Sequence, residues 1–296
     1  MRFHVHARIA QICIPRTRTQ ARCSTIPAAG PAEGGRSSSF RRRNTMGVLD
    51  DLLASLTGDC AVRHVLVGAH LTAVCSSRCG MASTVIDDRP HQRTVRDAGR
   101  LHLKSARELA EYARSGDPTE ASIGVAAINS LIVVDEVDIT EINAFDLIAR
   151  RGAGKCVAVV GSFPFVPRLR TLVGELLVIE RHPADGEYPA SAADRLIPRA
   201  DVVALTASSL INHTLDHLLS LCTPGAFVVV LGPTAPLSHV LLEHGATAVA
   251  GSIVTDEMGA IRAIEQGSSF RQLPGIRLAA MTVGPHGHGV EGLARV

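Results

Sequence analysis

Residues 156–165 read Cys-Val-Ala-Val-Val-Gly-Ser-Phe-Pro-Phe. The first five residues form a short apolar run, which is typical of a buried strand at the start of a parallel sheet. Such a strand often leads into a glycine-rich loop that holds a pyrophosphate. Here the loop carries two phenylalanines and a proline, which has no N–H to donate. The stretch therefore predicts the scaffold of a nucleotide-binding fold without its usual phosphate loop.

Four more apolar runs follow residues 157–160 at intervals of about 20 residues, which is the spacing of strand–helix–strand units. They are residues 176–179, 202–205, 227–231 and 246–250. This alternation predicts an α/β fold, a Rossmann-like parallel sheet with right-handed crossovers, over residues 141–285. Ligands of open parallel sheets bind at the carboxyl ends of the strands, so we expect the site in the five loops that follow these runs. We expect no NAD or FAD, because the chain lacks a Gly-x-Gly-x-x-Gly loop.

Residues 46–140 predict a small α+β domain that precedes this sheet. Residues 62–67 read as a strand, and residues 72–75 and 82–86 read as a further pair around Arg78-Cys79-Gly80. Residues 105–115 predict a helix that is capped by Ser105 with Glu108 three residues later, and residues 121–131 predict a second, apolar helix. A third, amphipathic helix is expected over residues 137–151.

The first 45 residues differ in composition from the rest of the chain. They hold nine arginines and one acid, which leaves 21 basic and 27 acidic residues beyond them. Their Arg-, Ser-, Pro- and Gly-rich pattern predicts a disordered leader, either a start-site artefact that precedes Met46 or an organelle transit peptide. The mildly acidic remainder gives no reason to expect nucleic-acid binding.

Apolar runs and cysteines bear on membrane insertion and on the cellular compartment of the protein. No apolar run reaches the roughly 18 residues of a membrane span, so we expect no membrane insertion. The seven scattered cysteines predict reduced thiols and a cytoplasmic protein. Cys75 and Cys79, with His70 nearby, form a weak soft-metal pattern, and buried thiols are the favoured interpretation. Residues 286–296, with His286 and His288, predict a flexible tail.

Polar residues follow two of the predicted strands. Glu180 ends the second run, where dinucleotide-binding folds place the acid that bonds a ribose, although an ordinary solvated acid fits equally well. Asn212, His213, Thr214 and His217 are expected to begin a helix after the third run, which suits an oxygen-rich or anionic ligand. His213 and His217 are four residues apart and would share one helix face, as metal ligands do.

Taken together, the loops resemble a bacterial and archaeal family described as heavy-metal chelation domains. The matching stretches are Gly161-Ser162-Phe163-Pro164-Phe165, Glu180-Arg181-His182-Pro183, Asn212-His213-Thr214, Gly232-Pro233-Thr234 and, upstream, Gly116-Asp117-Pro118. The resemblance implies an enolase-N-terminal-like domain packed on the Rossmann-like domain, with a site at their junction. It places ligand-binding positions at Asn129, Gly161, Phe163, Pro164, Glu180, Thr206, Asn212, Thr214, Gly232, Pro233 and Gly251. His213 departs from the small residue, often glycine, that is expected there.

Two functions follow as hypotheses. The first is a protein that binds a heavy metal or a metal complex, because Glu180, His182 and His213, with Asp185 nearby, offer the mixed oxygen and nitrogen donors that suit a divalent transition metal. The alternative is an enzyme that binds a nucleotide-like or tetrapyrrole-like molecule, with Glu180 or His213 as acid or base and Phe163 and Phe165 stacked on a flat ring. A self-associating scaffold is a weaker third, and a homodimer stays open.

Overall fold

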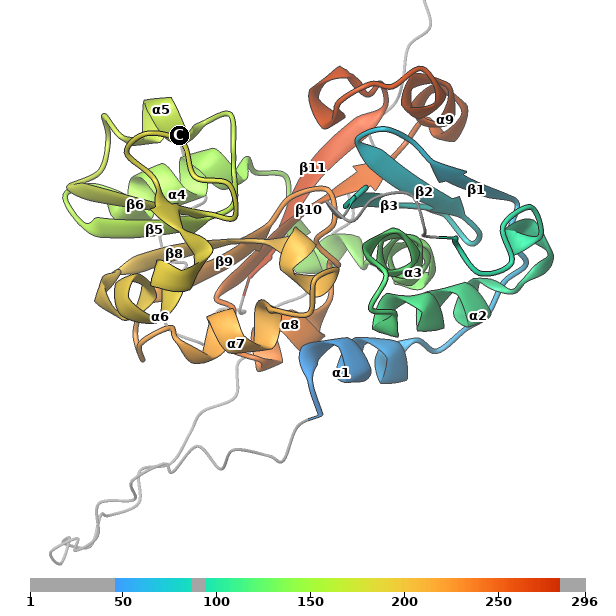
Figure 1. Cartoon of the computed structure of the whole chain (residues 1–296), viewed down its shortest axis with the longest axis horizontal. Helices are drawn as coiled ribbons and strands as arrows, with labels where there is room; N and C mark the ends of the chain where they lie inside the picture. Colours follow the sequence, from blue (N-terminus) through green and yellow to red (C-terminus); the bar gives the residue numbers. More distant parts are fainter. Residues whose placement is uncertain (1–45, 87–93, 283–296) are drawn as a thin grey trace, which may run out of the picture. The chain divides into compact units, whose positions relative to one another are not determined.

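The structure is a computed structural model that describes residues 46–86 and 94–282 (Figure 1). The predictions for the leader and for His286 and His288 lie outside these residues. All described residues belong to one compact unit, which contains a three-stranded sheet and an eight-stranded sheet. The longest described helix has 14 residues, and none combines the length and the apolar character that a bilayer crossing requires.

The larger sheet has the strand order β4-β11-β10-β9-β8-β5-β6-β7. Its strands are β4 (Ile139–Thr140), β5 (Cys156–Val160), β6 (Glu175–Glu180), β7 (Tyr188–Pro189), β8 (Val202–Thr206), β9 (Phe227–Leu231), β10 (Ala248–Val254) and β11 (Ile276–Thr282). The six strands from β5 to β10 run parallel, whereas β11 is antiparallel to β10 and to β4. The five predicted parallel strands and the α/β fold class are therefore confirmed. The strands β4, β7 and β11 were not predicted.

The order of the strands reverses next to β5. The chain runs from β5 to its neighbour β6 on one side, and then returns to β8 on the other side. Ligands of open parallel sheets bind at such a reversal, outside the carboxyl ends of the strands. The topology thus places the expected ligand site at the loops after β5 and β8, which start at Gly161 and Ala207.

Alternate residues of the parallel strands face opposite sides of this sheet, and helices cover both sides. Val157 and Val159 share one cluster with residues of α4 (Ala144–Gly152) and α5 (Val166–Leu169). Ala158 of the same strand belongs to a second cluster, which contains residues of three further helices. These helices are α6 (Ala193–Leu196), α7 (Leu215–Ser220) and α8 (His239–Glu243). Burial on both faces explains why the strands are apolar without alternation.

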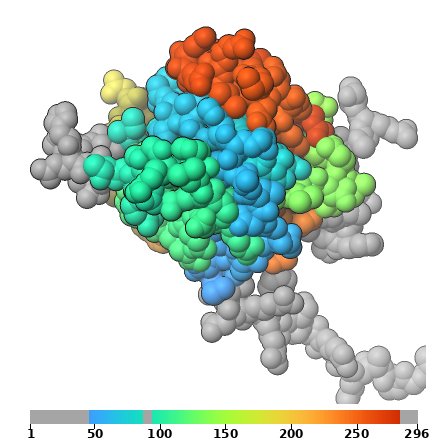
Figure 2. Space-filling view, turned by 90° about the vertical axis from the view of Figure 1, so that its right-hand side faces the viewer, coloured from blue at the N-terminus to red at the C-terminus, as the bar shows by residue number. Residues whose placement is uncertain are grey.

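The smaller sheet consists of β1 (His64–Val67), β2 (Leu71–Cys75) and β3 (Cys79–Ser83), which pair antiparallel in this order. Around it lie α1 (Val48–Ser55), α2 (Ala106–Ala110) and α3 (Pro118–Leu131). The capping box of Ser105 and Glu108 is present at the start of α2. A further helix, α9 (Glu257–Glu265), packs its Ile261 and Ile264 against β2 and β3. In Figure 2 the orange-red segment that contains α9 sits on the blue and cyan segment of these strands.

Several element predictions were wrong at their bounds, and for two of them the structure gives the reason. The second hairpin strand is Cys79–Ser83 and not residues 82–86, because Gly80 lies inside the strand, where any Cβ would clash with the Ala126 carbonyl oxygen of α3. The helix expected over residues 137–151 begins only at Ala144, because the Asn143 side chain accepts the Phe145 N–H at 2.9 Å and caps it there.

Short 3₁₀ turns complete the described chain. They are η1 (Leu101–Leu103), η2 (Glu111–Arg114), η3 (Glu136–Asp138), η4 (Ala190–Ala192), η5 (Ile197–Arg199), η6 (Ala207–Leu210) and η7 (Phe270–Gln272). One of them, η6, follows β8 directly, and the helix that was expected to begin with Asn212, His213 and Thr214 begins only at Leu215.

Candidate functional site

A cavity of about 1370 Å³ opens at the carboxyl ends of the parallel strands. The loops after β5, β6, β8 and β9 line it, together with Gly251 of β10. The remaining wall includes Ser83, at the end of β3, and Gly116 and Pro118, at the start of α3. The cavity therefore lies where the strand order reverses and where the two sheets approach each other.

Ten of the eleven predicted ligand-binding positions line this cavity. They are Gly161, Phe163, Pro164, Glu180, Thr206, Asn212, Thr214, Gly232, Pro233 and Gly251. The exception is Asn129, whose side-chain amide donates to the carbonyl oxygens of Met81, at 2.8 Å, and of Thr234, at 3.1 Å. Asn129 thus holds the loop after β9 against β3, outside the cavity wall.

Glycine is required at the end of β5 for two reasons. Gly161 has a φ of +115°, which side-chain-bearing residues rarely adopt. A Cβ at this position would also lie 2.8 Å from the Cβ of Thr206, the last residue of β8. Gly232, at the end of β9, has the same φ, but a Cβ there would meet nothing within 4 Å. The close approach of β5 and β8 therefore depends on Gly161 in particular.

Phenylalanine rings form one wall of the cavity. Phe163 and Phe165 stack with their centroids 5.0 Å apart and their planes 14° apart. Phe165 also packs at 5.8 Å against Phe145 of α4, so the stacked pair is anchored in the core beneath it. Both rings of the pair are only half-buried. They leave flat apolar surface open to a ligand, as the predicted stacking role requires.

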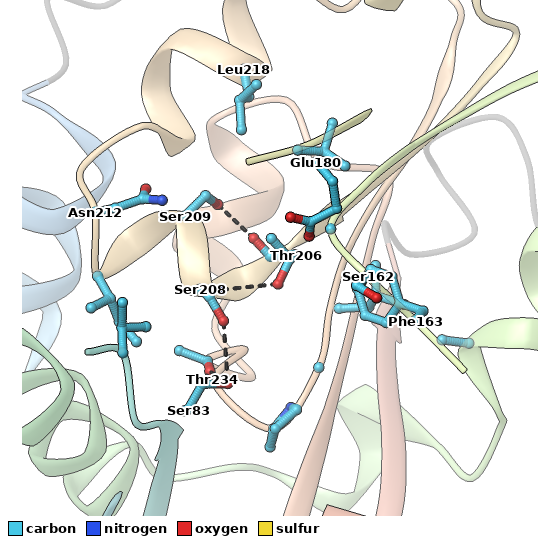
Figure 3. Close-up of a pocket in the computed structure, with 18 of the residues that line it drawn as sticks. Ser83, Ser162, Phe163, Glu180, Thr206, Ser208, Ser209, Asn212, Leu218 and Thr234 are labelled. Atoms are coloured by element: carbon cyan, nitrogen blue, oxygen red, sulfur yellow. Dashed lines mark hydrogen bonds between the residues drawn. The ribbon is translucent and has the colours of Figure 1, made fainter. Parts of the chain in front are cut away.

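Hydroxyl groups from both sheets meet at one place in the cavity (Figure 3). Ser83 Oγ accepts from Thr234 Oγ1 at 3.1 Å and from Ser208 Oγ at 3.2 Å. The Ser83 N–H in turn donates to Thr234 Oγ1 at 2.9 Å. Thr206 Oγ1 accepts the Ser208 N–H at 3.3 Å, which ties the loop after β8 to its own strand. Sequence reasoning placed Thr234 in a site loop but missed Ser83 and the contact between them, because this contact joins residues 151 positions apart and no local pattern marks it.

Arginine dominates the charge on the cavity wall. Arg168, Arg181 and Arg271 line it, whereas the lining acids are Glu180 and Asp194. The carboxylate of Asp194 already faces His217 Nε2 at 2.9 Å. The Arg168 guanidinium lies 4.5 Å above the Phe145 ring, which holds it beside the aromatic wall. The lining charges therefore favour an anionic ligand.

The predicted metal ligands are not brought together. Glu180 and His213 line the cavity, but His182 does not. Among residues 46–86 and 94–282, no three His, Cys, Asp or Glu side chains are grouped so that they could hold a metal ion. Since a protein site for a divalent transition metal usually supplies three or four such donors, the described donor set does not fit a bare ion.

His213 also differs from its predicted conformation. It lies in the turn between η6 and α7 with a φ of +58°, so it does not share a helix face with His217. Its Nε2 is 3.0 Å from the carbonyl oxygen of Ser115, just before α3. A positive φ explains why a glycine is expected at this position. The histidine adds a side-chain contact with the Ser115 carbonyl oxygen, which glycine could not make.

Two sequence models of known families match the chain. The DUF364 model matches residues 143–281 and the DUF4213 model matches residues 49–132, and both are described as "Putative heavy-metal chelation". Together they cover the smaller sheet and most of the larger one, and the gap between them, which contains β4, follows α3.

Individual relatives agree with these matches. The uncharacterized protein MJ0500 of Methanocaldococcus jannaschii is 30% identical over 185 residues, which are 60% of this chain and 70% of the relative. A DUF364 protein of unknown function from Desulfitobacterium hafniense has a solved structure with a TM-score of 0.70 and 26% identity, covering 80% of this chain and 98% of that one. The DUF364 protein PH1506 of Pyrococcus horikoshii, at 22% identity and a TM-score of 0.68, shares the fold over the same proportions. The chain therefore belongs to the DUF364 family, whose description is heavy-metal chelation.

Proposed function

We propose that the chain binds a metal in the form of a planar, anionic organic complex, in the cavity where its two sheets approach each other. One observation carries the proposal: a cavity of about 1370 Å³ combines an aromatic wall with an arginine-rich lining. Ligand pockets commonly enclose about 300–1000 Å³, so this cavity is far larger than a bare ion needs. It has room for a flat chelator together with its metal.

Each part of the wall has a role in this proposal. Phe163 and Phe165 stack on the flat face of the ligand, and Arg181 and Arg271 attract its acidic groups. Ser83 accepts hydrogen bonds from two neighbouring hydroxyls, so its own proton is available to an acceptor on the ligand. Glu180 and His213 both line the cavity, and either can complete the coordination of a metal that the chelator already holds.

A binding experiment separates this function from direct chelation. The full chain, purified without a histidine tag, is titrated with hydrated zinc, nickel and cobalt ions, with a carboxylated porphyrin, and with the metal complexes of that porphyrin. We expect the porphyrin and its complexes to raise the melting temperature and the hydrated ions to leave it unchanged. Stoichiometric uptake of a hydrated ion that is lost in Glu180→Gln would instead establish direct chelation.

Variants test the proposed wall. Phe163→Ala should weaken binding of the porphyrin complex by about two- to tenfold, because an aromatic stacking contact contributes roughly 0.5–1.5 kcal/mol. Arg181→Gln should weaken binding and reduce its dependence on salt. Phe227→Leu is the matched control, since Phe227 packs against Arg151 and does not line the cavity. If Phe163→Ala and Phe227→Leu bind the porphyrin complex with equal affinity, the aromatic wall does not contact the ligand.

The alternative function is an enzyme that acts on a similar ligand. Its support is that Glu180 and His213, the two candidate acid–base groups, both line the cavity. Incubation of the porphyrin complexes with the chain, followed by mass analysis, checks for a product. A product that disappears in both Glu180→Gln and His213→Gln would replace the binding function by this one.

A further inference from the structure

Two cysteines outside the cavity face each other across the smaller sheet. Cys75 is the last residue of β2 and Cys79 is the first residue of β3, and the two are partners in the strand register. The neighbouring pairs on this register are hydrogen-bonded: the Ser76 N–H donates to the Arg78 carbonyl oxygen at 2.9 Å. Because hydrogen-bonded and non-hydrogen-bonded pairs alternate, Cys75 and Cys79 form a non-hydrogen-bonded pair, whose Cα atoms are about 4.5 Å apart.

This position suits a covalent link. A disulfide joins residues whose Cα atoms are about 4.4–6.8 Å apart and whose Cβ atoms point toward each other, and a non-hydrogen-bonded pair meets both conditions. The two side chains do point at each other, since the Cys75 thiol contacts the Cys79 sulfur at 2.6 Å. Strand register alone, without any movement of the backbone, therefore brings the pair within bonding range.

The surroundings of the pair are apolar. Cys75 is 0% exposed and Cys79 is 7% exposed. They belong to a buried cluster with Met81 of β3 and with Ile261 and Ile264 of α9. Contact with Cys79, and burial, raise the pKa of the Cys75 thiol, so Cys75 stays protonated. No side chain of this cluster offers a hydrogen bond that competes with the contact between the two sulfurs.

The two cysteines differ in their access to a small pocket. Cys79 is among the residues that line a pocket of about 30 Å³ beside Arg78, whereas Cys75 is not. One water needs about 10–15 Å³ by the same measure, so this pocket has room for a molecule the size of hydrogen peroxide but excludes a bulky disulfide such as oxidised glutathione. Cys79 is thus the thiol that meets an oxidant first, and Cys75 is placed to react with the product.

We propose that Cys75 and Cys79 form a reversible intrachain disulfide when the chain meets hydrogen peroxide. Cys79 sulfur attacks one peroxide oxygen, which breaks the O–O bond, yields a sulfenic acid at Cys79 and releases one water. Cys75 sulfur then attacks the Cys79 sulfur, the S–O bond breaks, and a second water carries away the Cys75 proton. In sum, two thiols and one hydrogen peroxide give one disulfide and two waters. This site is independent of any ligand in the large cavity.

A shared soft metal ion is the competing use of two thiols, and geometry disfavours it. Thiolates bind zinc at about 2.3 Å, so two sulfurs on one tetrahedral ion lie roughly 3.8 Å apart, and further apart on a linear ion. The two sulfurs would therefore have to separate by more than about 1 Å within close-packed apolar side chains. Among the described residues no third metal-binding side chain joins the pair.

The test uses the full chain and peptide mapping. Reduced protein is treated with hydrogen peroxide, alkylated, and digested without reduction. We expect the peptide that holds Cys75 and Cys79 to lack both alkyl groups, to be lighter by two hydrogen atoms than its reduced form, and to become alkylatable again after dithiothreitol. Cys222, a free thiol that donates to the Leu218 carbonyl oxygen, should alkylate before and after peroxide.

Variants and alternative outcomes complete the test. In Cys75→Ser, peroxide should leave oxygen atoms on Cys79, because the resolving thiol is missing, whereas Cys222→Ser should form the link as the original chain does. The proposal fails if Cys75 and Cys79 in the original chain alkylate as fully as Cys222 after peroxide, or carry oxygen atoms instead of the link. It also fails if the reduced chain takes up one zinc or copper(I) ion that Cys75→Ser loses, and no link forms on oxidation.

Discussion

The side-chain amide of Asn129 donates to the main-chain carbonyl oxygen of Thr234, 105 residues later, at 3.1 Å. Because the same amide also donates to the Met81 carbonyl oxygen at 2.8 Å, one side chain of α3 joins β3 to the loop after β9. That loop carries the Thr234 hydroxyl into the cavity. Asn129 thus positions a wall of the cavity without belonging to it.

Replacing Asn129 should therefore lower stability. Asn129→Ala leaves two carbonyl oxygens without their donor, and we expect the free energy of unfolding to fall by about 1–3 kcal/mol. Urea denaturation measures this loss. Asn212→Ala is the control, because Asn212 is exposed and makes a local bond with Thr214, and its effect should stay within about 0.5 kcal/mol. Equal losses in the two variants would contradict the positioning role.

Gly161 and Gly232 have the same φ, so replacing each by alanine distinguishes the cost of a steric clash from the cost of backbone strain. Gly161→Ala and Gly232→Ala both place a Cβ at a φ of +115°, which costs about 1–3 kcal/mol. Only at residue 161 does the new Cβ also meet Thr206, at 2.8 Å. We expect Gly161→Ala to be less stable than Gly232→Ala by at least about 1 kcal/mol in the same urea assay. A larger loss for Gly232→Ala would count against the close approach of β5 and β8.

Because His213 has a positive φ, glycine should be more favourable than alanine at this position. His213→Gly and His213→Ala both lose the contact with the Ser115 carbonyl oxygen, but only glycine relieves the backbone at +58°. The glycine variant should therefore be more stable than the alanine variant by about 1 kcal/mol. Thermal unfolding of both variants, compared with the original chain, checks this difference. An alanine variant as stable as the glycine variant would show that the turn changes its conformation.

Asp97 should titrate abnormally. Its carboxylate accepts from Lys104 Nζ at 2.9 Å and from the Tyr112 hydroxyl at 3.0 Å, and these bonds, led by that from Lys104, hold the Asp97 pKa below its ordinary value. A lowered folded-state pKa contributes stability above the unfolded pKa of about 3.9, and this stability is lost as the pH falls through the folded pKa.

In Lys104→Met, the pKa of Asp97 should therefore rise toward its ordinary value, and acidification should destabilise this variant less than the original chain. Carboxyl NMR titration measures the first effect, and unfolding at a series of pH values measures the second. Lys155→Met is the control, since Lys155 is the other lysine of the chain and does not contact Asp97. An unchanged Asp97 pKa in Lys104→Met would assign the shift to Tyr112 instead.

Sequence reasoning found the elements whose signal is local. The five parallel strands are continuous apolar runs such as residues 156–160, and such runs arise because both faces of the sheet are covered by helices. It missed β11, whose residues Ile276–Thr282 mix charged and apolar side chains and pair with β10 only through tertiary contact. It misplaced β3 because it took Gly80 as a turn signal, whereas Gly80 is small to admit α3.

The same division applies to the site. Loop residues at strand ends, such as Gly161 and Thr206, could be placed on the cavity because parallel topology gathers strand ends at one edge. Ser83 could not, because its place on the cavity depends on how the smaller sheet packs against the larger one. The three predicted metal ligands do not all line the cavity: Glu180 and His213 do, whereas His182, two residues after Glu180, does not.

Through the hydrogen bonds of Ser83, a ligand in the cavity should affect whether the two sheets unfold together. Since its hydroxyl is held by Thr234 and Ser208, the part of the cavity wall that Ser83 forms is complete only while the smaller sheet is docked on the loops after β8 and β9. A ligand that binds only this assembled state stabilises the docking itself, in proportion to the logarithm of its concentration. Heating the chain with increasing amounts of ligand should then merge any separate melting of the two sheets into a single transition. An occupied cavity would then hold the two sheets together in addition to binding its ligand.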